Sequence, residues 1–482
     1  MKRPFTCLLL LSLIGLSTTS NLSAGHFIKP TVERFIKSTT GGFTRIAEAP
    51  DKGTARGVSV EEEIRNENPA FVVRVDVDHP DRVYMDRELM KVTVVSERAG
   101  YLYLLYKQAD GSEVCLFPNK IQRDNRIPAN RKLTVPAADS DFNLRIGAPF
   151  GKETLIALVT LKPLTADKFG AKSLTANDAT VVDFDVLIAK GVTVELRNKP
   201  TQWAEHHVSI TTVVAASAKP TVRKKRFGLF IGISNYDDER IKDLHVCHRD
   251  ATVMAKLMKD HGDLDVVTVL TEKNGTLANI RAAVKELVAK SNPGDEIFIY
   301  WSGHGATCAD DNGDEKDGLD EFLVPYDGKT GSLSAIRKSM LLDDTFGRWI
   351  QDLDGRRAVV ILDTCHSGGL SATTKAIAAP KTYFDFIDTE LARTKDIGQK
   401  DAAMLCSSDA DEVSAERKEG DVSVMTYFLL KRILENGGRR VTLRDAYDYV
   451  KVQVPAYIKK NFPGKEQTPI MVNEIGDLYL RR

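Results

Sequence analysis

The feature that most constrains the fold is an alternation, from residue 227 onward, between short runs of apolar residues and stretches with helical spacing. The expected strands are 227–233, 266–270, 297–301, 358–362 and 402–406, and the expected helices are 251–261 and 277–289. Strands without polar alternation are buried on both faces, which favours an α/β fold with a mainly parallel sheet flanked by helices. Reactive groups in such sheets gather at the carboxyl ends of the strands.

Two of the expected strands run into glycine-containing segments that carry a base and a nucleophile. These segments are 302–305 (Ser-Gly-His-Gly) and 363–368 (Asp-Thr-Cys-His-Ser-Gly). Glycine permits a sharp bend, so we expect two turns that open on the same sheet edge. An imidazole that takes the proton of a thiol makes it a nucleophile, and the imidazole later protonates the leaving amine. His304 and Cys365 are therefore the predicted catalytic pair, with the backbone N–H groups of Gly305 and Cys365 as oxyanion donors.

The paired motifs, 61 positions apart from His304 to Cys365, resemble those of caspases and metacaspases. The strand and helix order from residue 223 to 482 agrees with that family. The resemblance implies a caspase-like fold and a cysteine-type endopeptidase that uses a Cys-His dyad. The caspase signature Gln-Ala-Cys-x-Gly is not met, because Asp363 stands two residues before the cysteine.

The resemblance also implies a specificity pocket. In the metacaspase branch the side chain before the scissile bond meets a Cys-x-x-Asp element, a serine two residues before the histidine and an aspartate two residues before the cysteine. Carried over by motif, the pocket residues are Cys247, Asp250, Ser302 and Asp363. Two carboxylates in one pocket repel acidic side chains and pair with basic ones, so we expect protein or peptide substrates with Arg or Lys before the cleaved bond.

A calcium site is a weaker expectation from the same resemblance. Metacaspases take calcium ligands from an aspartate before the next strand and from a later Asp-Asp pair, which here would be Asp320, Asp343 and Asp344. The fourth carboxylate expected soon after the cysteine is missing from 369–375, so a solvated acidic loop is an equal alternative. The dyad chemistry itself requires no cofactor.

The first residues have the pattern of a secretory signal peptide. Lys2 and Arg3 precede an apolar run at 7–16, and Ala24 suits a cleavage point. The run is far shorter than the ~20 residues that cross a bilayer, so we expect cleavage, no transmembrane anchor afterwards, and an exported protein that is periplasmic or secreted. The 67 basic and 67 acidic side chains balance, which gives no field to attract nucleic acid.

We expect five parts along the chain. They are a signal peptide (1–24), a mobile leader (25–67), a β-rich, sandwich-like accessory domain (68–214), a basic linker (215–226) and the caspase-like peptidase domain (227–482). The accessory part resembles an uncharacterised domain often fused to bacterial caspase-like peptidases. Its two adjacent histidines, His206 and His207, are expected on the surface.

Two other functions stay open on the sequence. One is a catalytically silent caspase-fold binding or scaffold protein, against which the intact His304 and Cys365 argue. The other is a cell-envelope cysteine hydrolase or transpeptidase, which export and an accessory β domain would suit.

Overall fold

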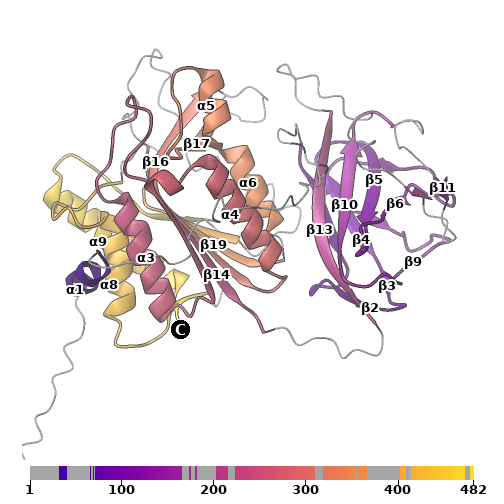
Figure 1. Ribbon diagram of the computed structural model, residues 1–482, viewed down its shortest axis with the longest axis horizontal. Coiled ribbons are helices and arrows are strands. Elements are labelled where there is room, and N and C mark those ends of the chain that lie inside the picture. Colours follow the sequence, from indigo (N-terminus) through magenta and orange to yellow (C-terminus); the bar gives the residue numbers. More distant parts are fainter. Residues whose placement is uncertain are drawn as a thin grey trace, which may run out of the picture.

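The computed structural model describes the chain in ranges and separates it into a β-rich part and an α/β part (Figure 1). The described residues are 32–40, 64, 66, 69, 71–164, 173–174, 180–181, 202–214, 223–309, 319–353, 355–366, 402–408, 412, 414–472 and 478–482. The predicted signal peptide lies outside these residues.

The β-rich part is a sandwich of two sheets. One sheet contains β1 (Val73–Val77), β4 (Val92–Ser96) and β8 (Leu133–Val135). The other contains β2 (Val83–Met85), β5 (Gly100–Lys107), β6 (Glu113–Phe117), β7 (Arg126–Ile127), β10 (Lys152–Thr160), β11 (Ser173–Leu174), β12 (Thr180–Val181) and β13 (Trp203–Val213), while β3 (Leu89–Met90) pairs with β9 (Leu144–Arg145). Alternate residues such as Val75, Leu104 and Ala157 meet in the core between the sheets, as period-two patterning predicts. The predicted β-rich, sandwich-like region is confirmed.

The surface prediction for His206 is wrong. β13 begins at Trp203, so His206 falls on the inward-facing register of the strand and is 4% exposed. Its Nε2 atom lies 2.9 Å from Nη1 of the buried Arg74, while His207 is half-buried with Nε2 2.9 Å from the Ile64 carbonyl oxygen. The sequence pattern did not reveal these polar partners for a buried ring.

The α/β part is built on a mainly parallel sheet, as expected. Its order is β15 (Val266–Thr271), β14 (Arg226–Gly232), β16 (Glu296–Ala309), β19 (Arg357–His366), β20 (Ala402–Cys406) and β22 (Ile470–Val472). The pairs from β15 to β20 are parallel, and β22 adds an antiparallel edge. The end of β16 also pairs with β17 (Leu319–Leu323), which pairs with β18 (Leu341–Leu342).

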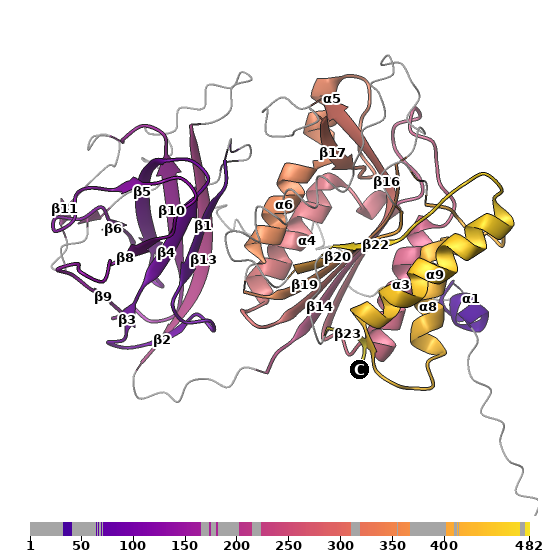
Figure 2. The same ribbon diagram turned by 180° about the vertical axis from the view of Figure 1, so that it is seen from behind.

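Helices cover both faces of this sheet (Figures 1 and 2). One face carries α4 (Leu277–Lys290) and α6 (Asp343–Asp352), and the other carries α3 (Cys247–His261), α8 (Val424–Leu434) and α9 (Leu443–Asn461). The remaining elements are η2 (Glu272–Asn274), α5 (Leu333–Ser339), β21 (Val441–Thr442) and β23 (Tyr479–Arg481). Gly232 lets α3 approach β14 closely, because a Cβ atom there would meet the Ala251 Cβ atom at 2.7 Å.

Among the helices that the structure describes, none combines the length and apolar content needed to span a bilayer.

The expected leader contains a folded element. Helix α1 (Val32–Thr40) buries Val32, Phe35 and Ile36 in the core shared by α3, α8 and α9. A mobile leader over all of 25–67 is therefore wrong for 32–40, where Val32, Phe35 and Ile36 have the spacing of one helix face. Most of the other leader residues lie outside the described part of the chain.

Candidate active site

His304 and Cys365 occupy neighbouring strands at matching positions. β16 and β19 run parallel, and their register pairs His304 directly with Cys365. The expected turns after residues 301 and 362 are absent, because both strands continue through the motifs. Gly303 serves close packing and not a bend, since a Cβ atom there would lie 3.2 Å from the Tyr236 hydroxyl. The backbone of Cys365 belongs to β19, and its side chain lies outside the described part of the structure.

The His304 ring is buried and held in one tautomer. Its exposed fraction is 3%, and Nε2 lies 2.7 Å from the backbone carbonyl oxygen of Lys242. A carbonyl oxygen only accepts, so Nε2 carries the proton and Nδ1 carries the lone pair of the neutral ring. Burial lowers the pKa of His304 below its usual value, which favours this neutral, basic form.

The two sequence motifs predict a Cys-His dyad, and the structure adds a third group from the main chain. The carbonyl of Lys242 orients the imidazole, while the His304 backbone N–H donates to the Tyr236 hydroxyl at 2.9 Å. That hydroxyl donates in turn to the Ile233 carbonyl oxygen at 3.1 Å. A backbone carbonyl carries no side-chain signature, so no sequence motif could have marked Lys242.

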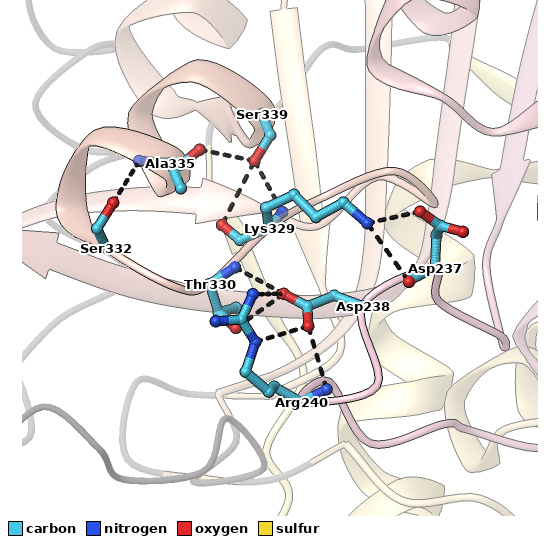
Figure 3. A network of polar contacts seen from close by, with 8 residues as sticks. All are labelled: Asp237, Asp238, Arg240, Lys329, Thr330, Ser332, Ala335 and Ser339. Carbon is cyan, nitrogen blue, oxygen red and sulfur yellow. Dashed lines mark hydrogen bonds and ion pairs between the residues drawn. The ribbon is translucent and has the colours of Figure 1, made fainter.

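The loop that holds the histidine, residues 233–246 between β14 and α3, is fixed by a buried carboxylate (Figure 3). Asp238 accepts two hydrogen bonds of 2.7 Å from the Arg240 guanidinium and one of 2.9 Å from the Thr330 backbone N–H. These donors hold the pKa of Asp238 well below its usual range. The side chain of Asp237, the preceding residue, forms an exposed ion pair with Lys329. Asp238 therefore anchors the loop three residues before the Ile241–Lys242 segment, whose Lys242 carbonyl oxygen contacts His304.

We expect Asp238→Asn to weaken both the fold and the orientation of His304. Losing a charged acceptor of several hydrogen bonds should lower the free energy of unfolding by about 1–3 kcal/mol at neutral pH. Because the pKa of Asp238 is depressed, this contribution is present above the ordinary carboxylate range near pH 4 and fades as pH falls toward the lower folded pKa. Denaturant unfolding at pH 7 and at pH 3 measures it. Asp237→Asn is the matched control and should change little; equal losses would contradict the anchoring role.

The predicted pocket residues come together beneath the pair. Asp250 on α3 is fully buried, and it accepts hydrogen bonds from the Ser302 hydroxyl at 2.9 Å and from the Ser423 backbone N–H at 2.8 Å. Asp363 on β19 is 4% exposed and lies close enough to affect the charge of Asp250. Cys247 is buried one turn before Asp250. The structure therefore gathers the four residues from α3, β16 and β19.

Further hydroxyl groups reach Asp363 from Ser414 and from the start of α8, and no sequence motif marks them. Asp363 accepts hydrogen bonds from the hydroxyls of Ser414 (2.7 Å), Thr426 (2.9 Å) and Ser423. Ser423 is also the N-cap of α8, because its oxygen accepts the Thr426 N–H at 3.1 Å. A serine before an apolar helix is a capping signal, but only the fold brings this cap to Asp363.

The two carboxylates are electrostatically unusual. Burial, followed by the nearby charge of Asp363, raises the pKa of Asp250 well above its ordinary value. The described groups that act on Asp250 and Asp363 are hydroxyls, a backbone N–H and other acids, and within the described ranges neither forms an ion pair with Lys or Arg. Two buried acids without a cation cost stability, so the arrangement suits a ligand that brings a positive charge.

The described residues do not fit the calcium site suggested by the sequence. Asp320 on β17 is already paired with the Arg337 guanidinium, Nη2 to Oδ2 at 2.5 Å. Asp343 is buried at the start of α6, and the side chain of Asp344 lies outside the described part. Within the residues searched, no group of three His, Cys, Asp or Glu side chains could hold a metal ion. A cation at Asp320 would face the fixed positive charge of Arg337.

Comparison with known proteins identifies both parts of the chain. The profile of the caspase domain matches residues 225–478, and that of a domain of unknown function, DUF4384, matches residues 83–163. Among solved structures, protein GSU0716 from Geobacter sulfurreducens aligns over 54% of this chain and 97% of its own at 21% identity, with a TM-score of 0.37.

The similar curated proteins are metacaspases. Metacaspase III c of Phaeodactylum tricornutum is 38% identical over 156 residues, which are 31% of this chain and 44% of that protein. Metacaspase-1A of Neurospora crassa is 34% identical over 154 residues, 30% of this chain and 32% of that protein. The chain thus spans less than half the length of these relatives. Because the caspase domain match covers over half of the chain and includes His304 and Cys365, the chain belongs to the caspase domain family of cysteine-type peptidases.

Proposed function

We propose that the protein is a cysteine endopeptidase that cleaves after Arg or Lys through Cys365 and His304. The observation that carries the proposal is the pair of buried carboxylates, Asp250 and Asp363, to which the described residues supply only neutral donors. A guanidinium or ammonium group entering beside them would supply the missing charge and hydrogen-bond donors. Membership of the caspase domain family supplies the reaction class.

The proposed chemistry follows from the tautomer of His304. Nδ1 takes the proton of the Cys365 thiol, and the sulfur then attacks the substrate carbonyl carbon. The backbone N–H groups of Gly305 and Cys365 are the proposed donors to the resulting oxyanion. When the tetrahedral intermediate collapses, the imidazolium protonates the leaving amine and an acyl-enzyme remains. Water activated by His304 hydrolyses the thioester and restores the thiol.

The acidic pocket supports the choice of substrate. A substrate with Asp before the scissile bond would add a third negative charge to a buried site, which is strongly unfavourable. An Arg or Lys side chain instead converts two unbalanced acids into an ion-paired cluster, and its binding favours the ionised form of Asp250.

The test is a positional-scanning peptide library with the purified chain, run with calcium and with a chelator. We expect cleavage after Arg and Lys, none after Asp, and equal rates in both conditions, since no cofactor is proposed for the dyad. Preference for Asp would contradict the pocket assignment. The mass of the product distinguishes hydrolysis from transpeptidation, the alternative activity, because transfer to an added amine gives a heavier product than hydrolysis.

We also propose that the protein is exported, to the periplasm or the medium, on the pattern of residues 1–24. Fractionation followed by N-terminal sequencing tests this: a mature chain beginning after Ala24 outside the cytoplasm is expected. An intact N-terminus on cytoplasmic protein would contradict it.

A further inference from the structure

Helix α1 buries one complete face although it precedes the β-rich part in the sequence. Val32, Phe35, Ile36 and Thr39 follow the spacing of one helix face, and all four are buried. The Thr39 hydroxyl is also satisfied, donating to the Phe35 carbonyl oxygen at 2.8 Å. A helix of nine residues is too short to be stable alone in water. Its structure therefore depends on the surface against which it lies.

That surface is formed by α3 and α8 of the peptidase part. Figures 1 and 2 show α1 beside both helices, and the three share one hydrophobic core. The Phe35 ring lies 5.5 Å from the Lys256 ammonium group and 6.5 Å from the His261 ring, both on α3. On the α8 side, the Tyr427 hydroxyl donates to Glu33 at 3.0 Å. The β-rich part is thus inserted in sequence between two segments, α1 and β14, that belong to the peptidase part.

The residue that α1 contacts on α8 adjoins the pocket. Tyr427 directly follows Thr426, whose hydroxyl binds Asp363. The Arg417 guanidinium lies 3.6 Å from the centre of the Tyr427 ring. Arg417 also closes the turn that leads into α8, through Asp421 at 2.7 Å and through its N–H to the Val422 carbonyl oxygen at 3.1 Å.

We propose that α1 is an intrachain clasp which, docked in the α3–α8 surface, fixes the segment 414–426 and so positions the acidic pocket. The clasp acts on Ser414, Ser423 and Thr426, the hydroxyl donors to Asp363. The described contacts of the His304 side chain are with Tyr236 and Lys242, not with α1. Loss of α1 should therefore lower the preference for a basic residue before the cleaved bond more than it slows the chemical step. This inference rests on the proposed Arg and Lys specificity.

The experiment places a charge in the buried face of α1 in the full chain. Phe35→Asp should displace α1, since an isolated carboxylate is costly in an apolar core. We expect kcat/KM for an Arg reporter to fall about tenfold, with a fall of at most about twofold for a matched Leu reporter. Ser38→Asp, on the exposed face of the same helix, is the control and should leave both unchanged. Adding a peptide of residues 29–42 in trans should restore Arg cleavage by Phe35→Asp.

The possible outcomes distinguish a failure of the proposed role of α1 from a failure of the proposed Arg and Lys specificity. A wild-type chain without preference for Arg over Leu contradicts the proposed function. A wild-type preference that Phe35→Asp retains, with hydrogen exchange showing α1 released, contradicts the clasp alone. If Phe35→Asp does not fold, Glu33→Gln takes its place, because it leaves the buried face of α1 intact and removes only the charge that acts on Tyr427, Arg417 and Lys431. It should lower the Arg-to-Leu ratio about twofold, and an unchanged ratio overturns the clasp.

Discussion

Cys365→Ala and His304→Ala are each expected to reduce cleavage of an Arg reporter by about four orders of magnitude or more, while the protein stays folded. Without the sulfur there is no acyl-enzyme, and without Nδ1 the thiol keeps its proton and the leaving amine receives none. Removing both groups together should cost no more than removing one, because residues that act as a unit are not additive. Single-turnover assays on the two variants and the double variant measure this.

Cys406 provides the matched control for the nucleophile. It lies on β20, the strand beside β19, where burial raises the pKa of its thiol to about 12. The thiol is therefore protonated at neutral pH and unable to attack. Cys406→Ala should keep activity within a few-fold of wild type. Loss of turnover in Cys406→Ala together with full activity in Cys365→Ala would move the nucleophile to another strand.

The pH profile gives an independent check on His304. Burial lowers the pKa of the imidazole, so its neutral form survives to lower pH than an ordinary histidine. For a neutral Leu reporter, kcat/KM should therefore decline only below about pH 6.5, the ordinary value. An acid limb above that value would show that another group controls the reaction.

The sequence predicted the sheet of the peptidase part well because buried parallel strands leave a plain signal. The apolar runs 227–233 and 297–301 correspond to β14 and the first half of β16. The pattern stopped at residue 301 because small and polar residues follow, yet β16 continues to Ala309 by pairing first with β19 and then with β17. Pairing partners distant in sequence, and not local apolarity, set that boundary.

Parts of the site were beyond sequence reasoning for a related reason. Ser302 and Asp363 could be found because they stand two residues before the predicted dyad. Ser423 and Thr426 carry an ordinary helix cap, and only the packing of α8 against α3 and β19 brings them to the carboxylates. Lys242 acts through its main chain, so its side chain gives no indication of the role. Motif spacing thus identifies residues that lie near the catalytic pair in the sequence. The residues that orient and hydrogen-bond them come from distant segments and are known only from the fold.

Asp250 and Asp363, the carboxylates of the proposed pocket, are expected to affect the cleavage of basic substrates more than that of neutral ones. Asp363→Asn and Asp250→Asn each remove one charge partner of a desolvated Arg side chain. We expect a loss of about 2–4 kcal/mol in transition-state binding, or roughly thirty- to a thousand-fold in kcat/KM, for Arg reporters. Leu reporters should lose much less. Equal losses on the two reporters would mean that the carboxylates maintain the structure and do not recognise the charge of the substrate side chain.

Replacing Asp250 with Asn should raise the stability of the fold while it lowers activity. This combination distinguishes a carboxylate that serves substrate binding from one that maintains the structure. Its raised pKa means that the folded chain binds a proton more tightly than the unfolded chain, so ionisation destabilises the fold as pH rises above the ordinary value of about 4. Asn keeps an oxygen for the Ser423 N–H and carries no charge. Asp250→Asn should thus raise the melting temperature relative to wild type, more at pH 8 than at pH 5, while it impairs Arg cleavage. The same substitution should remove the rise of Arg-reporter kcat/KM with pH that accompanies ionisation of Asp250. A variant that melts lower at both pH values would instead make Asp250 a structural carboxylate.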